Sequence, residues 1–161
     1  MARNKIEIKG LDSVIKDLNK LGKSISIPIK SGITKATKKC QKRAKLLCPV
    51  DTGTLRNSIN TEIRAKAEEV EGEVETNLEY AVYVEYGTGP TGNGTYPYTI
   101  KGINLKYKAD KWRGNIPNIG VRWISGQKAQ PYMYPAYAET KEELPKILKE
   151  ECDKVLRGRK N

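Results

Sequence analysis

Apolar residues recur at helical spacing in two long segments of the chain. Between about residues 29 and 47 they are three or four residues apart, which matches the 3.6-residue period of an α-helix: Ile29, Ile33, Ala36, Cys40, Ala44 and Leu47. The opposite face is basic and carries Lys35, Lys38, Lys39, Lys42, Arg43 and Lys45. Pro49 is expected to end this helix. A stripe that starts at Leu144 predicts a C-terminal helix, with a capping box at 140–143 and with Pro145 at its start or at a kink.

Alternating apolar and polar residues predict short strands elsewhere. Residues 5–9 fit a strand, and residues 12–21 then fit a short helix. Residues 61–66 and 70–76 predict a hairpin that bends at 67–69 and carries Glu71, Glu73 and Glu75 on one face. Residues 80–86 are apolar and fit either a helix or a strand.

Residues 87–128 are rich in Gly, Pro, Tyr and Lys. Strand-like runs occur at 98–100 and 121–124, so we expect a long projecting loop or an irregular hairpin. A loop of this length is usually functional or mobile. With a length of 161 residues, the chain is expected to form a single domain over 1–161, with an insertion at about 88–128.

Charge is segregated along the chain. The formal net charge is +11; residues 1–50 hold 13 Lys and Arg against 3 Asp and Glu, whereas residues 51–90 hold 3 against 9. This pattern suits a protein that works near nucleic acid, or one whose basic and acidic faces meet in an oligomer.

The three cysteines, Cys40, Cys48 and Cys152, suggest reduced thiols, and Cys40 lies in the apolar stripe as a small core residue. The chain has no His, which removes the commonest general base and metal ligand. We expect no cofactor, no metal and no membrane span, because no apolar run approaches the roughly 18 residues that a span needs.

Two motifs offer catalytic or nucleotide-binding interpretations. Asp51-Thr52-Gly53 is the triplet of aspartic proteases, but it follows a basic helix rather than an apolar strand, which favours a turn. In that turn Asp51 is expected to bond the downstream backbone, and Thr54 to cap a short helix that ends near Ile59. Residues 87–92 fit a Gly-x-Gly-x-x-Gly pattern, yet the prolines and glycines that follow are expected to prevent the helix that this motif requires.

The inserted loop concentrates basic and aromatic residues. We expect its side chains to face DNA or a protein partner: Lys101, Lys106, Lys108, Lys111, Trp112 and Arg113. Aromatic side chains interleaved with cations are suited to stacking on nucleic-acid bases. Tyr, Trp and Arg also concentrate at protein interfaces. Of the two, we favour the protein interface.

Three segments together resemble a family of tailed-phage tail-component, tail-completion or head–tail joining (neck) proteins. They are Pro49–Ile59, Tyr80–Gly89 and Ala129–Ala136. The resemblance implies structural signature positions at Asp51, Thr52, Gly53, Leu55, Arg56, Tyr83, Glu85, Gly87, Thr88, Gln130 and Pro131. Many members pass quickly from the Gly-Thr element to the Gln-Pro element, whereas about 40 residues intervene here.

The resemblance implies an α+β fold in which helices pack on a small antiparallel sheet. It also implies a non-enzymatic virion protein of the neck or tail, present as a ring of several copies, six by first choice. Its expected partners are itself, neighbouring neck, connector, tail-terminator or tail-tube proteins, and DNA in the channel. A basic nucleic-acid-binding module is the alternative, and a retroviral-type aspartic protease is a more distant one.

Overall fold

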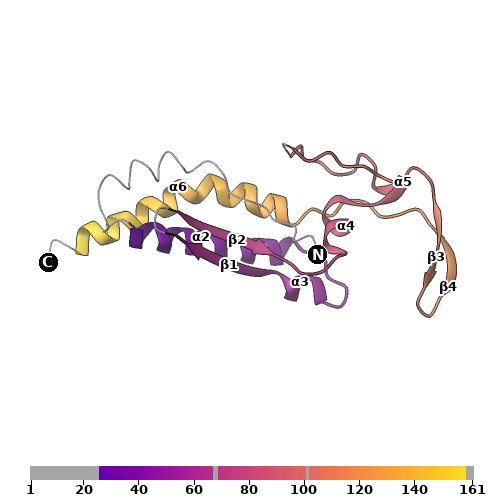
Figure 1. The fold of residues 1–161 in the computed structure, drawn as a ribbon, viewed down its shortest axis with the longest axis horizontal. Helices are drawn as coiled ribbons and strands as arrows, with labels where there is room; N and C mark the ends of the chain where they lie inside the picture. Colours follow the sequence, from indigo (N-terminus) through magenta and orange to yellow (C-terminus); the bar gives the residue numbers. More distant parts are fainter. Residues whose placement is uncertain (1–25, 67–68, 101, 159–161) are drawn as a thin grey trace.

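The computed structural model describes residues 26–66, 69–100 and 102–158. The strand expected at 5–9 and the helix expected at 12–21 lie outside these residues. The described chain is α+β, as expected: helices combine with two small antiparallel sheets. Figure 1 shows an elongated body made of α2, α3, β1, β2, α4 and α6, from which an arm carrying α5, β3 and β4 projects at one end. We use "arm" for residues 88–128.

Helix α2 (Ser26–Leu47) packs against both α6 and the β1–β2 hairpin. It begins three residues before the expected start, with Pro28 in its first turn, where a missing N–H costs no helical hydrogen bond. Its predicted apolar stripe is buried except at Leu47, which is 46% exposed. The expectation for Leu47 was wrong because the i, i+4 row continues from Ala44 to Cys48, which is 2% exposed.

Residues 54–75 form the next part of the body. Helix α3 (Thr54–Ser58) leads into strands β1 (Asn60–Ala65) and β2 (Val70–Glu75), which pair antiparallel with Ile63 opposite Gly72. The predicted hairpin is thereby confirmed. Gly72 lies against α2, since a Cβ there would stand 1.9 Å from Thr37 Oγ1. This close approach brings the sheet onto the helix.

Helix α6 (Met133–Gly158) runs antiparallel to α2 along the body (Figure 1). It starts seven residues before Thr140, so the capping box expected at 140–143 is wrong. Thr140 lies inside the helix, where its hydroxyl donates to the Ala136 carbonyl at 2.7 Å. The helix also continues through Pro145, which rules out a start at that residue. Packing along the whole length of α2 outweighs the cost of one proline.

Two apolar clusters make the core. One lies between the start of α2 and the middle of α6: Ile29, Ile33, Ala36, Leu144 and Leu148. The other joins the end of α2 to α3, α4 and the start of α6: Cys40, Ala44, Cys48, Leu55, Ile59, Ala81, Tyr132, Met133 and Ala136. Cys40 is a core residue, as expected, and its burial raises the pKa of its thiol.

Residues 80–86, which fitted either a helix or a strand, form helix α4 (Ala81–Tyr86). In the arm, the one-turn helix α5 (Gly89–Gly92) lies within the Gly-x-Gly-x-x-Gly pattern, with Pro90 in its first turn, and no helix follows it in residues 93–100 or 102–111. Strands β3 (Trp112–Ile116) and β4 (Gly120–Ile124) pair as a two-stranded ribbon. The strand expected at 121–124 is therefore confirmed, but residues 98–100 form no strand.

Candidate assembly surface

The first signature segment joins the end of α2 to α3. Gly53 takes φ 83°, a left-handed conformation that glycine adopts at little cost, and its carbonyl accepts from Asn57 N at 3.0 Å. Leu55 is 6% exposed and belongs to the core. Arg56 Nη2 donates to the Cys48 carbonyl at 3.5 Å. These contacts set the path of the chain after α2.

Two expectations about this turn are wrong. Within the described part of the chain, Asp51 has no hydrogen-bond or ion-pair partner, and its side chain is exposed. Thr52 takes the local bonding role instead, since its Oγ1 accepts from Thr54 N at 3.4 Å and lies 2.8 Å from Thr54 Oγ1. Thr54 is the first residue of α3 rather than its cap, because the preceding Gly53 holds the cap position.

Glu85, in the second signature segment, accepts three hydrogen bonds through its side chain. Its carboxylate is 4% exposed and accepts three backbone N–H groups at the start of α6: Tyr132 at 2.7 Å, Met133 at 2.9 Å and Tyr134 at 3.0 Å. These donors have no partner inside the helix, and the helix dipole favours a negative charge beside them. A side chain of α4 therefore caps α6 from 47 to 49 residues away in sequence.

The two ends of the arm are clamped together beside Glu85. Thr88 and Gln127 exchange backbone hydrogen bonds, with Thr88 N to Gln127 O at 2.9 Å and Gln127 N to Thr88 O at 3.1 Å. Gln127 Nε2 also donates to the Tyr83 carbonyl at 2.9 Å. Gly126 has φ 85°, and a Cβ there would stand 1.9 Å from Thr88 O. The arm thus leaves and re-enters the body at one tight junction.

The remaining signature positions lie at the same junction. Gly87 has φ 78°, and a Cβ would approach Ala129 N to 2.7 Å. Gln130 N donates to the Val84 carbonyl at 2.8 Å, and Pro131 follows just before α6. The structure therefore brings Tyr83, Glu85, Gly87, Thr88, Gln130 and Pro131 together, while Asp51 to Arg56 form a separate turn that reaches the same core through Leu55.

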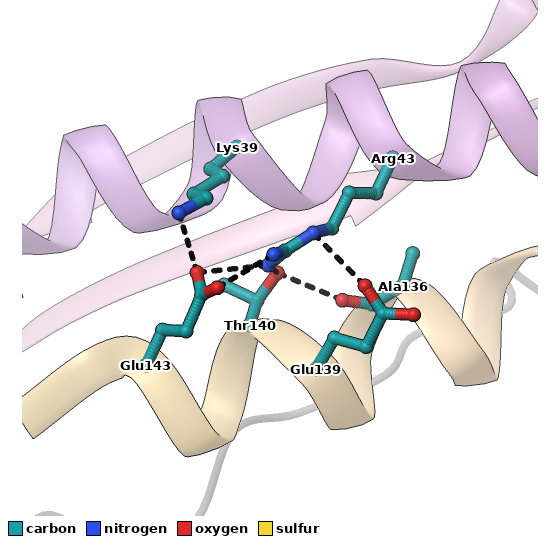
Figure 2. A network of polar contacts seen from close by, with 6 residues as sticks. All are labelled: Lys39, Arg43, Ala136, Glu139, Thr140 and Glu143. Atoms are coloured by element: carbon teal, nitrogen blue, oxygen red, sulfur yellow. Dashed lines mark hydrogen bonds and ion pairs between the residues drawn. The ribbon is translucent and has the colours of Figure 1, made fainter.

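The basic face of α2 is partly covered by α6. Arg43 makes a bidentate pair with Glu143, with N–O distances of 2.7 and 3.0 Å, and its Nε lies 3.1 Å from Glu139 (Figure 2). Lys39 also pairs with Glu143, and these cations lower the pKa of that carboxyl to about 2.

Further along the two helices, Lys35, Ser31 and Lys154 surround Glu151 and lower its pKa to about 2. The basic face of α2 is therefore neutralised by α6 at Lys35, Lys39 and Arg43. Lys38 and Lys42 remain exposed on α2.

The basic residues expected to face a partner lie mostly on the exposed arm. Lys106, Lys108, Lys111 and Arg113 are exposed, and Lys101 lies outside the described residues. Trp112 is half-buried: Lys108 Nζ lies 5.1 Å from its ring centroid, and its ring packs against Gly89. Trp112 therefore fixes the ribbon to α5.

An apolar groove of about 750 Å³ opens between α4 and the arm. One wall carries Tyr80 and Tyr83, and the other carries residues 105–108 and Trp112. Tyr107 donates its hydroxyl hydrogen to the Tyr86 carbonyl at 2.9 Å, which ties the second wall to the first.

The most exposed large apolar side chain of the arm is not among the residues expected to face a partner. Trp123 is 69% exposed on β4, and its neighbours Ile119 and Val121 are 56% and 52% exposed. Their alternation in a strand-like run was a usable signal, because residues two apart share a face of a strand. The ribbon thus carries an apolar face open to solvent.

Other kinds of site receive no support from the described residues. Over 26–66, 69–100 and 102–158, no three His, Cys, Asp or Glu side chains gather as a metal site requires. None of the helices in this part of the chain is both long and apolar enough to cross a membrane. The arrangement offers surfaces and a groove for a partner.

Comparison with known proteins agrees with this arrangement. Residues 12–87 match the model of a family described as "Bacteriophage HK97-gp10, putative tail-component". The match spans the first signature, the hairpin and α4 through Gly87, and it ends where the arm begins. Comparisons with curated proteins and with solved structures returned no match. Residues 12–87, somewhat less than half of the chain, are thus similar to this family of bacteriophage tail components.

Proposed function

We propose that this protein is a non-enzymatic structural component of a phage neck or tail-completion region. Several copies, six by our first choice, form a ring that joins the tail to the head or connector. The match of residues 12–87 to a tail-component family is the observation that carries the proposal. In this proposal the chain is one domain over 1–161 with an insertion at about 88–128, and it enters the virion during assembly in the bacterial cytoplasm.

The use of the signature residues supports a structural role. Leu55 packs in the core, Glu85 caps α6, and Thr88 closes the arm with Gln127. These contacts hold an arm at a defined place on a body. A protein that positions an arm in this way is suited to joining neighbours in a particle.

Charge segregation supports assembly from several copies. Residues 91–130 hold 7 Lys and Arg against 1 Asp, whereas residues 51–90 are acidic. Contacts between unlike surfaces are heterologous, and they close into a ring when the rotation between copies allows it. Neck, connector, tail-terminator or tail-tube proteins are the proposed neighbours.

The exposed lysines of the arm also suit a non-specific contact with DNA in the channel. If DNA binding were the main role, the protein would bind DNA in a salt-sensitive manner without forming rings. This outcome would favour the basic nucleic-acid-binding module over the neck component.

Electron microscopy of purified particles, together with mass measurement of the isolated protein, tests the proposal. We expect ring-shaped density between head and tail, in which the copies are related by rotational symmetry about the tail axis. A soluble monomer in isolation is compatible with this result, because neighbours can supply the template. A single asymmetric copy per particle, or a location away from the neck and tail, would contradict the proposal.

A further inference from the structure

The β3–β4 ribbon has two different faces. Its register pairs Trp112 with Ile124 and Arg113 with Trp123. Because side chains alternate along a strand, Trp112 and Trp123 point to opposite sides of the ribbon. Trp112 faces the groove and α5, whereas Trp123 is 69% exposed. We call the side that carries Val121 and Trp123 the outer face of the ribbon, with Ile119 at its turn.

The groove is a matching concave surface. It encloses about 750 Å³, and its α4 wall presents Tyr80 and Tyr83, which are 43% and 55% exposed. A groove of this size accommodates several large side chains. The ribbon of the same chain cannot fill it with Trp123, because Trp112 of that ribbon lines the groove and Trp123 points to the opposite side.

We propose that the outer face of the ribbon of one copy docks into the α4–arm groove of a second copy. This inference rests on the proposed ring and names the contact that builds it. Donor and acceptor are different surfaces of the same molecule, so each copy offers one of each. Such a head-to-tail contact propagates from copy to copy and closes as a ring.

Charge favours one orientation of this contact. Arg113 lies directly across from Trp123 on the outer face. Glu79 is exposed and directly precedes Tyr80 of the α4 wall in the chain, whereas Lys106 and Lys108 line the arm wall of the groove. Arg113 is therefore attracted to the α4 wall, by Glu79 and by the tyrosine rings, and repelled by the arm wall.

The chemistry of the outer face favours a protein partner over DNA. Beside Arg113 and Asn115 it exposes the apolar side chains of Val121 and Trp123, with Ile119 exposed at the turn. DNA contacts are made mostly by cations and polar groups to phosphates, whereas a buried Trp beside an Arg is typical of the energetic centre of a protein interface.

Cysteine cross-linking between two variants tests the contact. One variant carries Val121→Cys, on the same face of the ribbon as Trp123, and the other carries Tyr83→Cys, both in a Cys152→Ser background in which Cys40 and Cys48 remain buried. The control replaces Val121→Cys by Ile27→Cys; Ile27 is 70% exposed at the start of α2, far from the arm (Figure 1).

On mild oxidation of the mixture we expect the Val121→Cys and Tyr83→Cys pair to cross-link about tenfold faster than the control pair, since Trp123 stays in place and one interface anchor is worth a factor of this order. Adding Arg113→Glu to the first variant should slow the reaction. Equal rates for the two mixtures, or equally fast linking of Val121→Cys to itself, would overturn the head-to-tail contact.

Imaging of assembled particles separates this inference from the proposed function. Rings in the neck without the cross-link would leave the function standing and overturn this contact. The cross-link without any neck or tail location would support the contact and contradict the function. DNA that protects Trp123 while the cross-link fails would assign the outer face to nucleic acid and overturn the inference.

Discussion

In the body, two apolar clusters are enclosed between α2, α6 and the β1–β2 hairpin, and a row of carboxylates on α6 neutralises three cations of α2. In the arm, a two-stranded ribbon leaves Trp123 69% exposed. A hairpin of two strands is at best marginally stable in water without another layer. The difference teaches that the body supplies stability, while the arm keeps its apolar surface for a partner.

Glu85→Ala should cause the largest loss of stability, because Glu85 joins the body to the base of the arm. The substitution removes the buried acceptor of three backbone N–H groups at the start of α6. Losing charged hydrogen bonds there should lower the free energy of unfolding by about 3 kcal/mol or more. Urea denaturation measures the change. Glu79→Ala, at an exposed position of the same region, should change it by less than about 0.5 kcal/mol.

Gly72→Ala tests the packing of the body. The added Cβ would stand 1.9 Å from Thr37 Oγ1 and 3.1 Å from Ile33 Cγ2, so the hairpin must move away from α2. We expect a loss of about 1–3 kcal/mol by thermal or urea unfolding. In the arm, Gly94→Ala meets nothing within 4 Å and bears only the cost of its left-handed φ of 72°, about 1 kcal/mol. A larger loss of stability from Gly94→Ala than from Gly72→Ala would contradict the view that the body is packed more tightly than the arm.

Acid should weaken the body through Glu143 and Glu151. Their pKa values in the folded protein are about 2, below the ordinary value of 4.5. A lowered folded pKa stabilises the protein above pH 4.5, and this contribution is lost as the pH falls from about 4.5 towards 2. The urea midpoint should therefore decrease over this range. Glu143→Gln should make the decrease shallower, whereas the exposed Glu142→Gln should leave it unchanged.

Limited trypsin digestion compares the arm with the body directly. In the free protein we expect the first cleavage between Lys106 and Arg113, because this stretch is exposed and lacks regular structure before β3. Assembly into particles should protect it. Equal resistance of the arm in both states would show that its order does not depend on a partner.

Trp123→Ser should have the smallest effect on stability. Its side chain is mostly exposed, so the free energy of unfolding should change by less than about 0.5 kcal/mol. Assembly should nevertheless be lost if the outer face of the ribbon is the docking surface, as size measurements on assembled samples would show. A large loss of stability would mean that Trp123 packs within its own molecule. Ile27→Ser removes an equally exposed apolar residue and is the control.

Local patterns predicted most elements of the body. The helical period found α2, alternation found the β1–β2 hairpin, and the resemblance pointed to segments that meet around α4 and the start of α6. These predictions succeeded because each depends on residues close together in the chain. The turn at Asp51 was located correctly, but its bonding was not, because Thr52 offered an equally good acceptor.

The predictions that failed concern features that depend on contacts between residues far apart in the sequence. Thr140 looked like a helix cap, yet α6 starts seven residues earlier because Glu85 supplies the cap from α4. Helix α5 was not predicted: its single turn is held by hydrogen bonds from Gly92 N to Thr88 O and from Thr91 N to Ser125 O. Strand β3 had no clear pattern of its own and is defined by pairing with β4.

By itself, the sequence determined the helical and strand periods, the segregation of charge and the resemblance of its first half to a tail-component family. Tertiary structure decided where α6 begins, which lysines of α2 are neutralised and which of the two tryptophans is open to a partner. The physical reason is range. Periodicity follows from backbone geometry between near neighbours, whereas caps, ion pairs and exposure depend on which groups 40 to 120 residues apart are brought within bonding distance.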